Sequence, residues 1–95
     1  MEPLTDEQVD ARLAGDLSGW ARADGALVRE VTTADFAAAI ELVNAVAGVA
    51  EECNHHPDIL VHGWNHLRLT LSTHSAGGLT AADLALAGRL DALLR

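Results

Sequence analysis

The sequence predicts a single α+β domain whose elements follow in the order α-β-β-α-β-β-α. Three segments begin with the local pattern of a helix start, and two pairs of extended runs, each joined by a turn, lie between them. The length of 95 residues suits one domain spanning residues 1–95. Because tight turns pair strands antiparallel, we expect a four-stranded antiparallel sheet with three helices packed on one face.

The helix starts share a threonine that stands three residues before a glutamine or aspartate, which is the spacing of a capping box. These threonines are Thr5, Thr32 and Thr80. We expect helices over residues 6–14, 33–53 and 81–94, and the first should end at Gly15. In the second helix a stripe of apolar residues is predicted to face the core, namely Phe36, Ile40, Val43, Ala47 and Ala50.

The first pair of predicted strands covers residues 17–22 and 26–31, around an Asp24-Gly25 turn that is typical of a hairpin. The second pair covers residues 59–62 and 65–73, with Gly63 in or beside the turn. In the last run leucines alternate with polar residues, so one face should pack on the core and the other should be polar.

Composition and charge exclude several classes of function. The net charge of −8 disfavours direct binding to nucleic acid or to an anionic membrane, because phosphates would repel the chain. No apolar run is long enough to span a membrane, and no secretory signal is visible. A lone cysteine, Cys53, suits a reducing compartment, so we expect a cytoplasmic protein.

A modest aliphatic core and open sheet edges favour self-association. The chain has two tryptophans, one phenylalanine and no tyrosine, so a small domain of this kind gains from burial between copies. We expect a homodimer or homotetramer, formed most simply by edge-to-edge pairing of strands.

The histidines are the most distinctive feature, since all five lie between positions 55 and 74. His55-His56-Pro57 follows the second helix and His74 ends the long strand, and the predicted fold can bring both loops to one end of the sheet. His62 and His66 flank a turn and are expected to be solvated. Imidazoles exchange protons near pH ~6.5, so the cluster indicates general acid–base chemistry.

Other interpretations of these residues are weaker. Taken singly, His56 could favour the negative end of a helix dipole and His74 could satisfy a carbonyl at the strand end. Adjacent histidines cannot easily bind one ion, and no zinc motif is present, so no metal is expected. Cys53 lies in the last helical turn and more simply packs as a small apolar residue than acts as a nucleophile.

Several motifs together resemble the signature of pterin-4a-carbinolamine dehydratases, and the element order is also that family's fold. The motifs are Glu51-x-x-x-His55-His56-Pro57, Trp64, Ser72-Thr73-His74, Gly78-Leu79-Thr80 and Asp83. The resemblance implies dehydration of a 4a-hydroxytetrahydropterin to a quinonoid dihydropterin and water, without a cofactor. It also implies a pathway shared with an aromatic amino acid hydroxylase. One departure is an extra residue between Pro57 and Trp64, expected at His62-Gly63 as a bulge or a longer turn.

The resemblance also implies roles for individual residues. His55, His56 and His74 match the family's active-site histidines; His55 and His74 would transfer protons, while His56 would hold and orient the pterin. Pro57 would fix its loop, and Thr73 belongs to the same motif as His74 and would contact substrate.

Three further candidate site residues each allow both a functional and a structural interpretation. Glu51 lies one helical turn before His55 and is either a partner for an imidazole or a solvated acid at the helix end. Asp83 is accounted for by the capping box, yet it also lies on the apolar stripe of its helix and could border the pocket. Trp20 is either a wall for the pterin ring or part of the core.

Three functions therefore remain in view. The first is a pterin dehydratase that acts by histidine general acid–base catalysis. The second is a non-catalytic binding or regulatory dimerisation module of the same fold, since members of the resembled family also serve as dimerisation cofactors or assembly partners. The third is a metal-binding domain, which the spacing of the histidines favours least.

Overall fold

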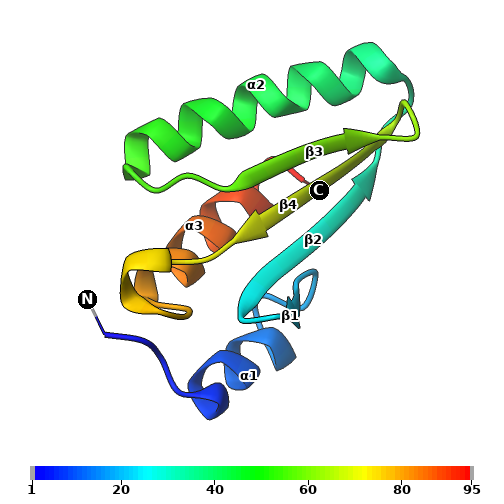
Figure 1. Cartoon of the computed structure of the whole chain (residues 1–95). Helices are drawn as coiled ribbons and strands as arrows, with labels where there is room; N and C mark the ends of the chain where they lie inside the picture. Colours follow the sequence, from blue (N-terminus) through cyan, green and yellow to red (C-terminus); the bar gives the residue numbers. More distant parts are fainter. Residues whose placement is uncertain (1, 95) are drawn as a thin grey trace.

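The structure is a computed structural model in which residues 2–94 are described, and it has an α+β fold (Figure 1). The predicted order of helices and strands and the antiparallel sheet are confirmed. A short 3-10 helix after the last strand was not expected. The elements are α1 (Asp6–Ala14), β1 (Ala21–Ala23), β2 (Ala26–Thr32), α2 (Phe36–Cys53), β3 (Asp58–His62), β4 (His66–Leu71), η1 (His74–Ala76) and α3 (Ala81–Asp91).

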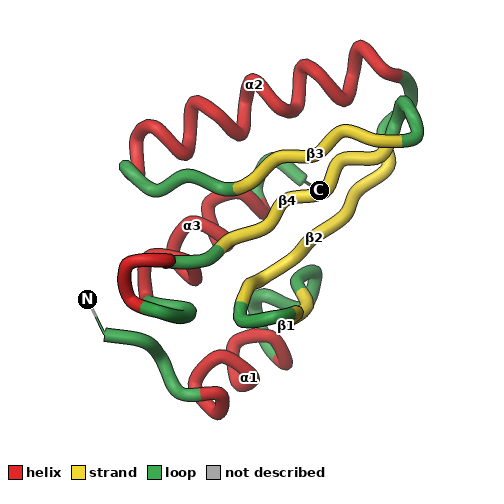
Figure 2. Tube along the Cα trace, viewed as in Figure 1, coloured by secondary structure: helices red, strands yellow, loops and turns green. Residues whose placement is uncertain are grey.

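The four strands form one sheet in the order β1-β2-β4-β3, and each neighbouring pair is antiparallel (Figure 2). The ladder between β2 and β4 joins segments that are far apart in sequence, and it runs from the Leu27–Leu71 pair to the Thr32–His66 pair. Within residues 2–94, β3 pairs with β4 alone and β1 with β2 alone, so both β1 and β3 are edges of the sheet.

The core lies between the sheet and the helices. The alternating leucines of β4 (Leu67, Leu69 and Leu71) are buried, which confirms the period of two. They share one cluster with Leu86 and Leu90 of α3. Burying one such side chain contributes about 1.5–3 kcal/mol, so this face holds the helix layer on the sheet.

Two of the three predicted helix caps are confirmed. The Thr5 and Thr80 side chains cap α1 and α3, each with a complete capping box. The prediction for α2 is wrong, because the Asp35 carboxylate accepts the N–H of Ala38 and the helix starts at Phe36 rather than at residue 33. Thr32 instead belongs to the β2 ladder, which extends one residue further than the pattern suggests.

The predicted buried face of α2 is also partly wrong. Ala39, Val46 and Ala50 are buried, whereas Phe36 and Ile40 are 55% and 38% exposed. Apolar residues occur on both sides of this helix, so their periodicity alone does not identify the side that packs on the sheet.

The two hairpins differ in how closely they follow prediction. Strand β1 is shorter than expected, because the N–H of Trp20 donates to the Leu17 carbonyl in a turn before the strand begins. The extra residue near His62 lies in the turn of the second hairpin: His62 pairs directly with His66, and the ladder of β3 is regular up to that pair. The extra residue therefore lengthens the loop and produces no bulge.

The helices also bear on membrane association. Within residues 2–94, none of them has both the length and the apolar character that crossing a bilayer requires.

Candidate functional site

The end of α2 aims His55 at the start of α3. Asn54 ends α2 in the left-handed conformation, with φ 49° and ψ 40°. The chain therefore changes direction at this residue, and the next side chain, His55, reaches the N-terminal turn of α3. The His55 Nε2 atom lies 2.6 Å from Oδ1 of Asp83. The His55 side chain is 18% exposed, and that of Asp83 is fully buried.

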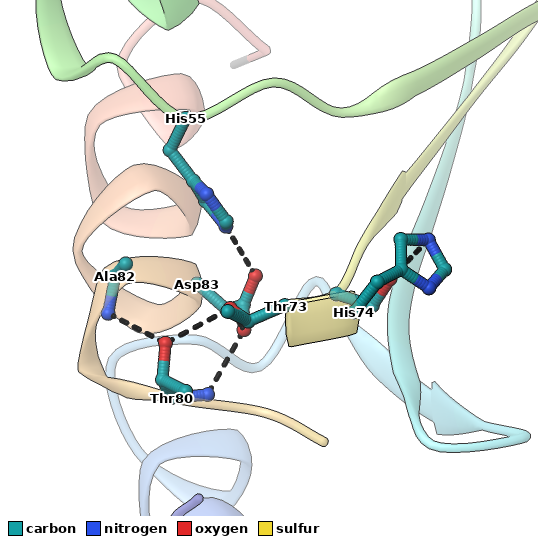
Figure 3. A network of polar contacts seen from close by, with 7 residues as sticks. His55, Thr73, His74, Thr80, Ala82 and Asp83 are labelled. Carbon is teal, nitrogen blue, oxygen red and sulfur yellow. Dashed lines mark hydrogen bonds and ion pairs between the residues drawn. The ribbon is translucent and has the colours of Figure 1, made fainter. Parts of the chain in front are cut away.

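The second oxygen of the Asp83 carboxylate is held by two more donors. The Thr73 hydroxyl donates to Oδ2 at 2.7 Å, and the backbone N–H of Thr80 donates to the same oxygen at 2.9 Å (Figure 3). The Thr80 hydroxyl lies 2.9 Å from that of Thr73 and completes the chain of contacts. Asp83 thus joins the cap of α3 to the loop after β4.

This arrangement fixes the position of a proton on His55. An ionised carboxylate can only accept hydrogen bonds, so the His55 Nε2 atom must carry the hydrogen that Asp83 receives. Among the contacts of residues 2–94, the other ring nitrogen, Nδ1, makes no hydrogen bond. Nδ1 of His55 therefore has no protein partner in this part of the chain, while Nε2 faces a buried carboxylate.

His56 and Glu51 form a second, separate pair at the surface. The His56 Nε2 atom lies 2.6 Å from Oε2 of Glu51, and the two side chains are 57% and 76% exposed. The adjacent histidines therefore contact different carboxylates. In the described part of the chain, no group of three or more histidine, cysteine or acidic side chains is arranged to hold a metal ion.

His74 lies on the other side of Thr73 from His55. It begins η1, and its exposed ring points away from Asp83 (Figure 3). The His74 Nε2 atom is 3.4 Å from Oγ of Ser72. His55 and His74 are thus brought to the same end of the sheet as predicted, with Thr73 between them, but their rings do not contact each other.

A cavity of about 560 Å³ opens beside His74. Its floor includes a row across three strands, since Val28 of β2 and Asp58 of β3 both pair with Thr70 of β4. Of the predicted site residues, Thr73 and His74 line this cavity. The other lining residues are Ala23, Asp24, Gly25, Ala26, Arg68, Ser72, Gly77 and Gly78.

Trp20 lies in the core and does not line the cavity. Its indole is 4% exposed, and its Nε1 donates to Oδ1 of Asp91 at 2.7 Å. Arg29 of β2 pairs with the same carboxylate oxygen at 2.5 Å. Trp20 thus joins the first hairpin to the end of α3, which agrees with the interpretation of Trp20 as a core residue.

Sequence reasoning did not identify Asp58 as a candidate. Nothing in its immediate neighbourhood distinguishes it from a surface acid, and only the register of β3 on β4 places it in the cavity. Pro57, which directly precedes it, is half-buried.

Comparison with known proteins shows the family of the chain. The family model for pterin 4 alpha carbinolamine dehydratase matches residues 2–93. A relative from Mycobacterium tuberculosis is 50% identical over 93 residues, which are 98% of this chain and 97% of that protein. One from Mycolicibacterium vanbaalenii is 49% identical over 94 residues and covers 99% of both chains. Both relatives carry the name pterin-4-alpha-carbinolamine dehydratase only provisionally.

Two solved structures share the fold. One from Brucella melitensis, described as a transcriptional coactivator/pterin dehydratase, has a TM-score of 0.89 at 30% identity and covers 99% of this chain and 100% of that one. The other is a pterin dehydratase-like protein identified as a RuBisCO assembly factor, with a TM-score of 0.65 at 26% identity over 80% of this chain and 89% of that one. Since the family model spans nearly the whole sequence and full-length relatives are about half identical, this chain belongs to the pterin-4a-carbinolamine dehydratase family.

Proposed function

We propose that the protein is a lyase that dehydrates a 4a-hydroxytetrahydropterin to a quinonoid dihydropterin and water. The observation that carries this proposal is the 2.6 Å contact between His55 and the fully buried Asp83. A buried carboxylate behind an imidazole is an arrangement suited to proton transfer at neutral pH. Family membership supplies the class of substrate.

The reaction requires two proton movements. The bond between C4a and its hydroxyl oxygen breaks, and an acid protonates the departing oxygen to give water. A base removes the proton from N5, and the electron pair of that N–H bond forms the C4a=N5 double bond. General acid–base catalysis of this kind contributes about 10²- to 10⁴-fold to a rate.

His55 is assigned the role of base. Its Nδ1 atom accepts the N5 proton, and the imidazolium that results is stabilised by the negative charge of Asp83. Thr73 and Thr80 hold that carboxylate in place, because both donate to its other oxygen. Asp83 is therefore a positioning residue, and it also serves the capping box of α3.

His74 is assigned the role of acid for the departing hydroxyl. It lines the cavity and its ring is exposed, so a substrate lying over Thr73 has one imidazole on each side. His56, paired with Glu51, holds and orients the pterin at the rim, and Pro57 fixes the loop that leads from His56 into β3.

A second candidate function is a non-catalytic binding module of the same fold. The relative identified as a RuBisCO assembly factor favours it, because that protein has a pterin dehydratase-like fold and acts in assembly. The complete set of His55, His56 and His74 in this chain supports the enzyme over the module.

The proposal includes a cytoplasmic location and a homodimer or homotetramer. Strand β3 is an open edge, and Ile59 and Leu60 on it are 37% and 49% exposed. Pairing of β3 with the same strand of a second copy would cover its unpaired backbone groups. Upstream, an aromatic amino acid hydroxylase would supply the substrate.

The test is to follow the ultraviolet absorbance of freshly generated 4a-hydroxytetrahydropterin with wild-type protein, with His74→Ala and with His66→Ala. His66 lies at the opposite end of β4 and is the matched control. We expect rapid dehydration by the wild type and the control, and a loss of about 10²-fold or more in His74→Ala. No acceleration by folded wild-type protein would reject the enzyme and favour the binding module.

A further inference from the structure

Asp58 places a carboxylate on the floor of the cavity, close to the proposed catalytic residues in space. It is the first residue of β3, and its Cα partner in β4 is Thr70, whose partner in β2 is Val28. Directly paired residues point to the same face of a sheet, so these three side chains form one row. All three line the cavity that Thr73 and His74 also border.

The Asp58 carboxylate has no protein partner in the described part of the chain. It makes no side-chain hydrogen bond and no ion pair with any of residues 2–94. Among the described residues that line the cavity there is one arginine, Arg68, and it pairs with Glu30 instead, with its Nε atom 3.5 Å from Oε1 of that residue. Asp58 is therefore free to accept hydrogen bonds from a ligand.

A pterin carries the complementary group. On its pyrimidinone ring, N3–H and one N–H of the 2-amino group point in the same direction, so a carboxylate can accept both in parallel. Such charge-assisted, bidentate contacts are roughly twice as strong as neutral ones and fix orientation as well. The methyl groups of Val28 and the hydroxyl of Thr70 complete the floor beneath the ring.

We propose that Asp58 binds the 2-amino-4-oxo edge of the pterin and so directs the C4a–N5 edge toward Thr73 and His74. This inference rests on the proposed function, because it names the contact that would orient the substrate of that reaction. In this assignment Asp58 is a binding residue and takes no part in proton transfer.

The test measures binding without turnover, by isothermal titration calorimetry with two unreactive probes. One is 6-methylpterin, and the other is 6-methyl-4-oxopteridine, which lacks the 2-amino group. Wild type, Asp58→Asn and Asp58→Ala are compared, with Glu41→Gln as the control for a general charge effect, since Glu41 is exposed on α2 and does not line the cavity. Circular dichroism establishes that each variant is folded.

We expect both Asp58 variants to bind 6-methylpterin about 10- to 100-fold more weakly than the wild type, as loss of a charged hydrogen-bond partner predicts. The probe without the amino group should bind the wild type more weakly, and substitution of Asp58 should weaken its binding by a smaller factor, because only its N3–H remains to donate to the carboxylate. Glu41→Gln should stay within about twofold of the wild type, since it removes one negative charge without the contact.

Three outcomes would overturn the inference: unchanged affinity of the Asp58 variants for 6-methylpterin, an equal loss for both probes, or no binding of 6-methylpterin by the wild type. The dehydration assay separates these results from failure of the proposed function. If the wild type dehydrates the substrate but 6-methylpterin binding does not depend on Asp58, this inference alone is overturned. If 6-methylpterin binding depends on Asp58 but the wild type shows no dehydration activity, the proposed catalysis alone is overturned.

Discussion

Replacing Asp83 by asparagine should change the tautomer of His55, moving the ring hydrogen from Nε2 to Nδ1, while the fold is kept. The Asp83 Oδ2 atom accepts from Thr73 and from the Thr80 N–H, so the single oxygen of an asparagine is held at that position. The amide NH₂ group must then face the His55 Nε2 atom, where Oδ1 stands in the wild type. Because an NH₂ group only donates, the imidazole must accept at Nε2 and carry its hydrogen on Nδ1.

The consequence for catalysis follows from that tautomer. A His55 with hydrogen on Nδ1 cannot accept the N5 proton there, and the charge that stabilised the imidazolium is gone. We expect kcat to fall by about 10²- to 10⁴-fold, the contribution of one general base. This corresponds to about 3 to 5 kcal/mol of transition-state stabilisation. KM should change much less, because Asp83 does not contact the pterin in the proposed mechanism.

The assay is dehydration of 4a-hydroxytetrahydropterin followed by absorbance, with Asp91→Asn as a matched control. Asp91 is the partly buried acid at the other end of α3, where it pairs with Arg29. The control should lose stability and keep its turnover while folded. If folded Asp83→Asn retained kcat within about threefold of the wild type, His55 could not be the base that this reasoning requires.

Three other results are expected. Leu69→Ala removes a side chain that is 1% exposed and should lower the free energy of unfolding in urea by about 2–5 kcal/mol; a loss below about 1 kcal/mol would contradict the packing of the helices on β4. The hydrogen bond from His62 lowers the pKa of Glu30, so its contribution to stability is present above the ordinary glutamate pKa and lost as pH falls through the lowered one. Carboxyl-carbon NMR should show the Glu30 pKa rising in His62→Ala, and an unchanged value would exclude that cause. Leu60→Lys on the edge strand β3 should shift the protein to monomer by light scattering, whereas an unchanged mass would move the interface elsewhere.

Short-range rules predicted much of this fold. The caps at Thr5 and Thr80 depend on residues three positions away, and the alternation along β4 depends on a period of two. Both patterns are local, so they are readable without knowledge of what packs against them. The order of elements followed from these signals.

The start of α2 could not be predicted in the same way. Thr32 and Asp35 can each cap a helix, and the choice between them depends on whether Thr32 pairs with His66 in the sheet. That pairing joins distant segments, so no local pattern contains it. The buried side of α2 was ambiguous for a related reason, since only contact with the sheet separates Ala39 from Ile40.

The candidate site shows the same division. Sequence motifs singled out His55, His74 and Asp83, but the contact between His55 and Asp83 spans 28 positions and depends on how α2 and α3 meet. Asp58 had no motif at all, because its place in the cavity results from the register of three strands. The residues of the candidate site were therefore largely predictable from motifs, while their hydrogen-bond partners were not.

The contact between Trp20 and Asp91 also provides an optical reporter. The chain has two tryptophans, and Trp20 is 4% exposed while Trp64 is 62% exposed. An indole shielded from water emits at shorter wavelengths than a solvated one, so the two signals are separable. In Trp64→Phe the remaining emission comes from the junction of the first hairpin with the end of α3. The wavelength of its emission maximum would report in real time whether α3 is packed on the sheet.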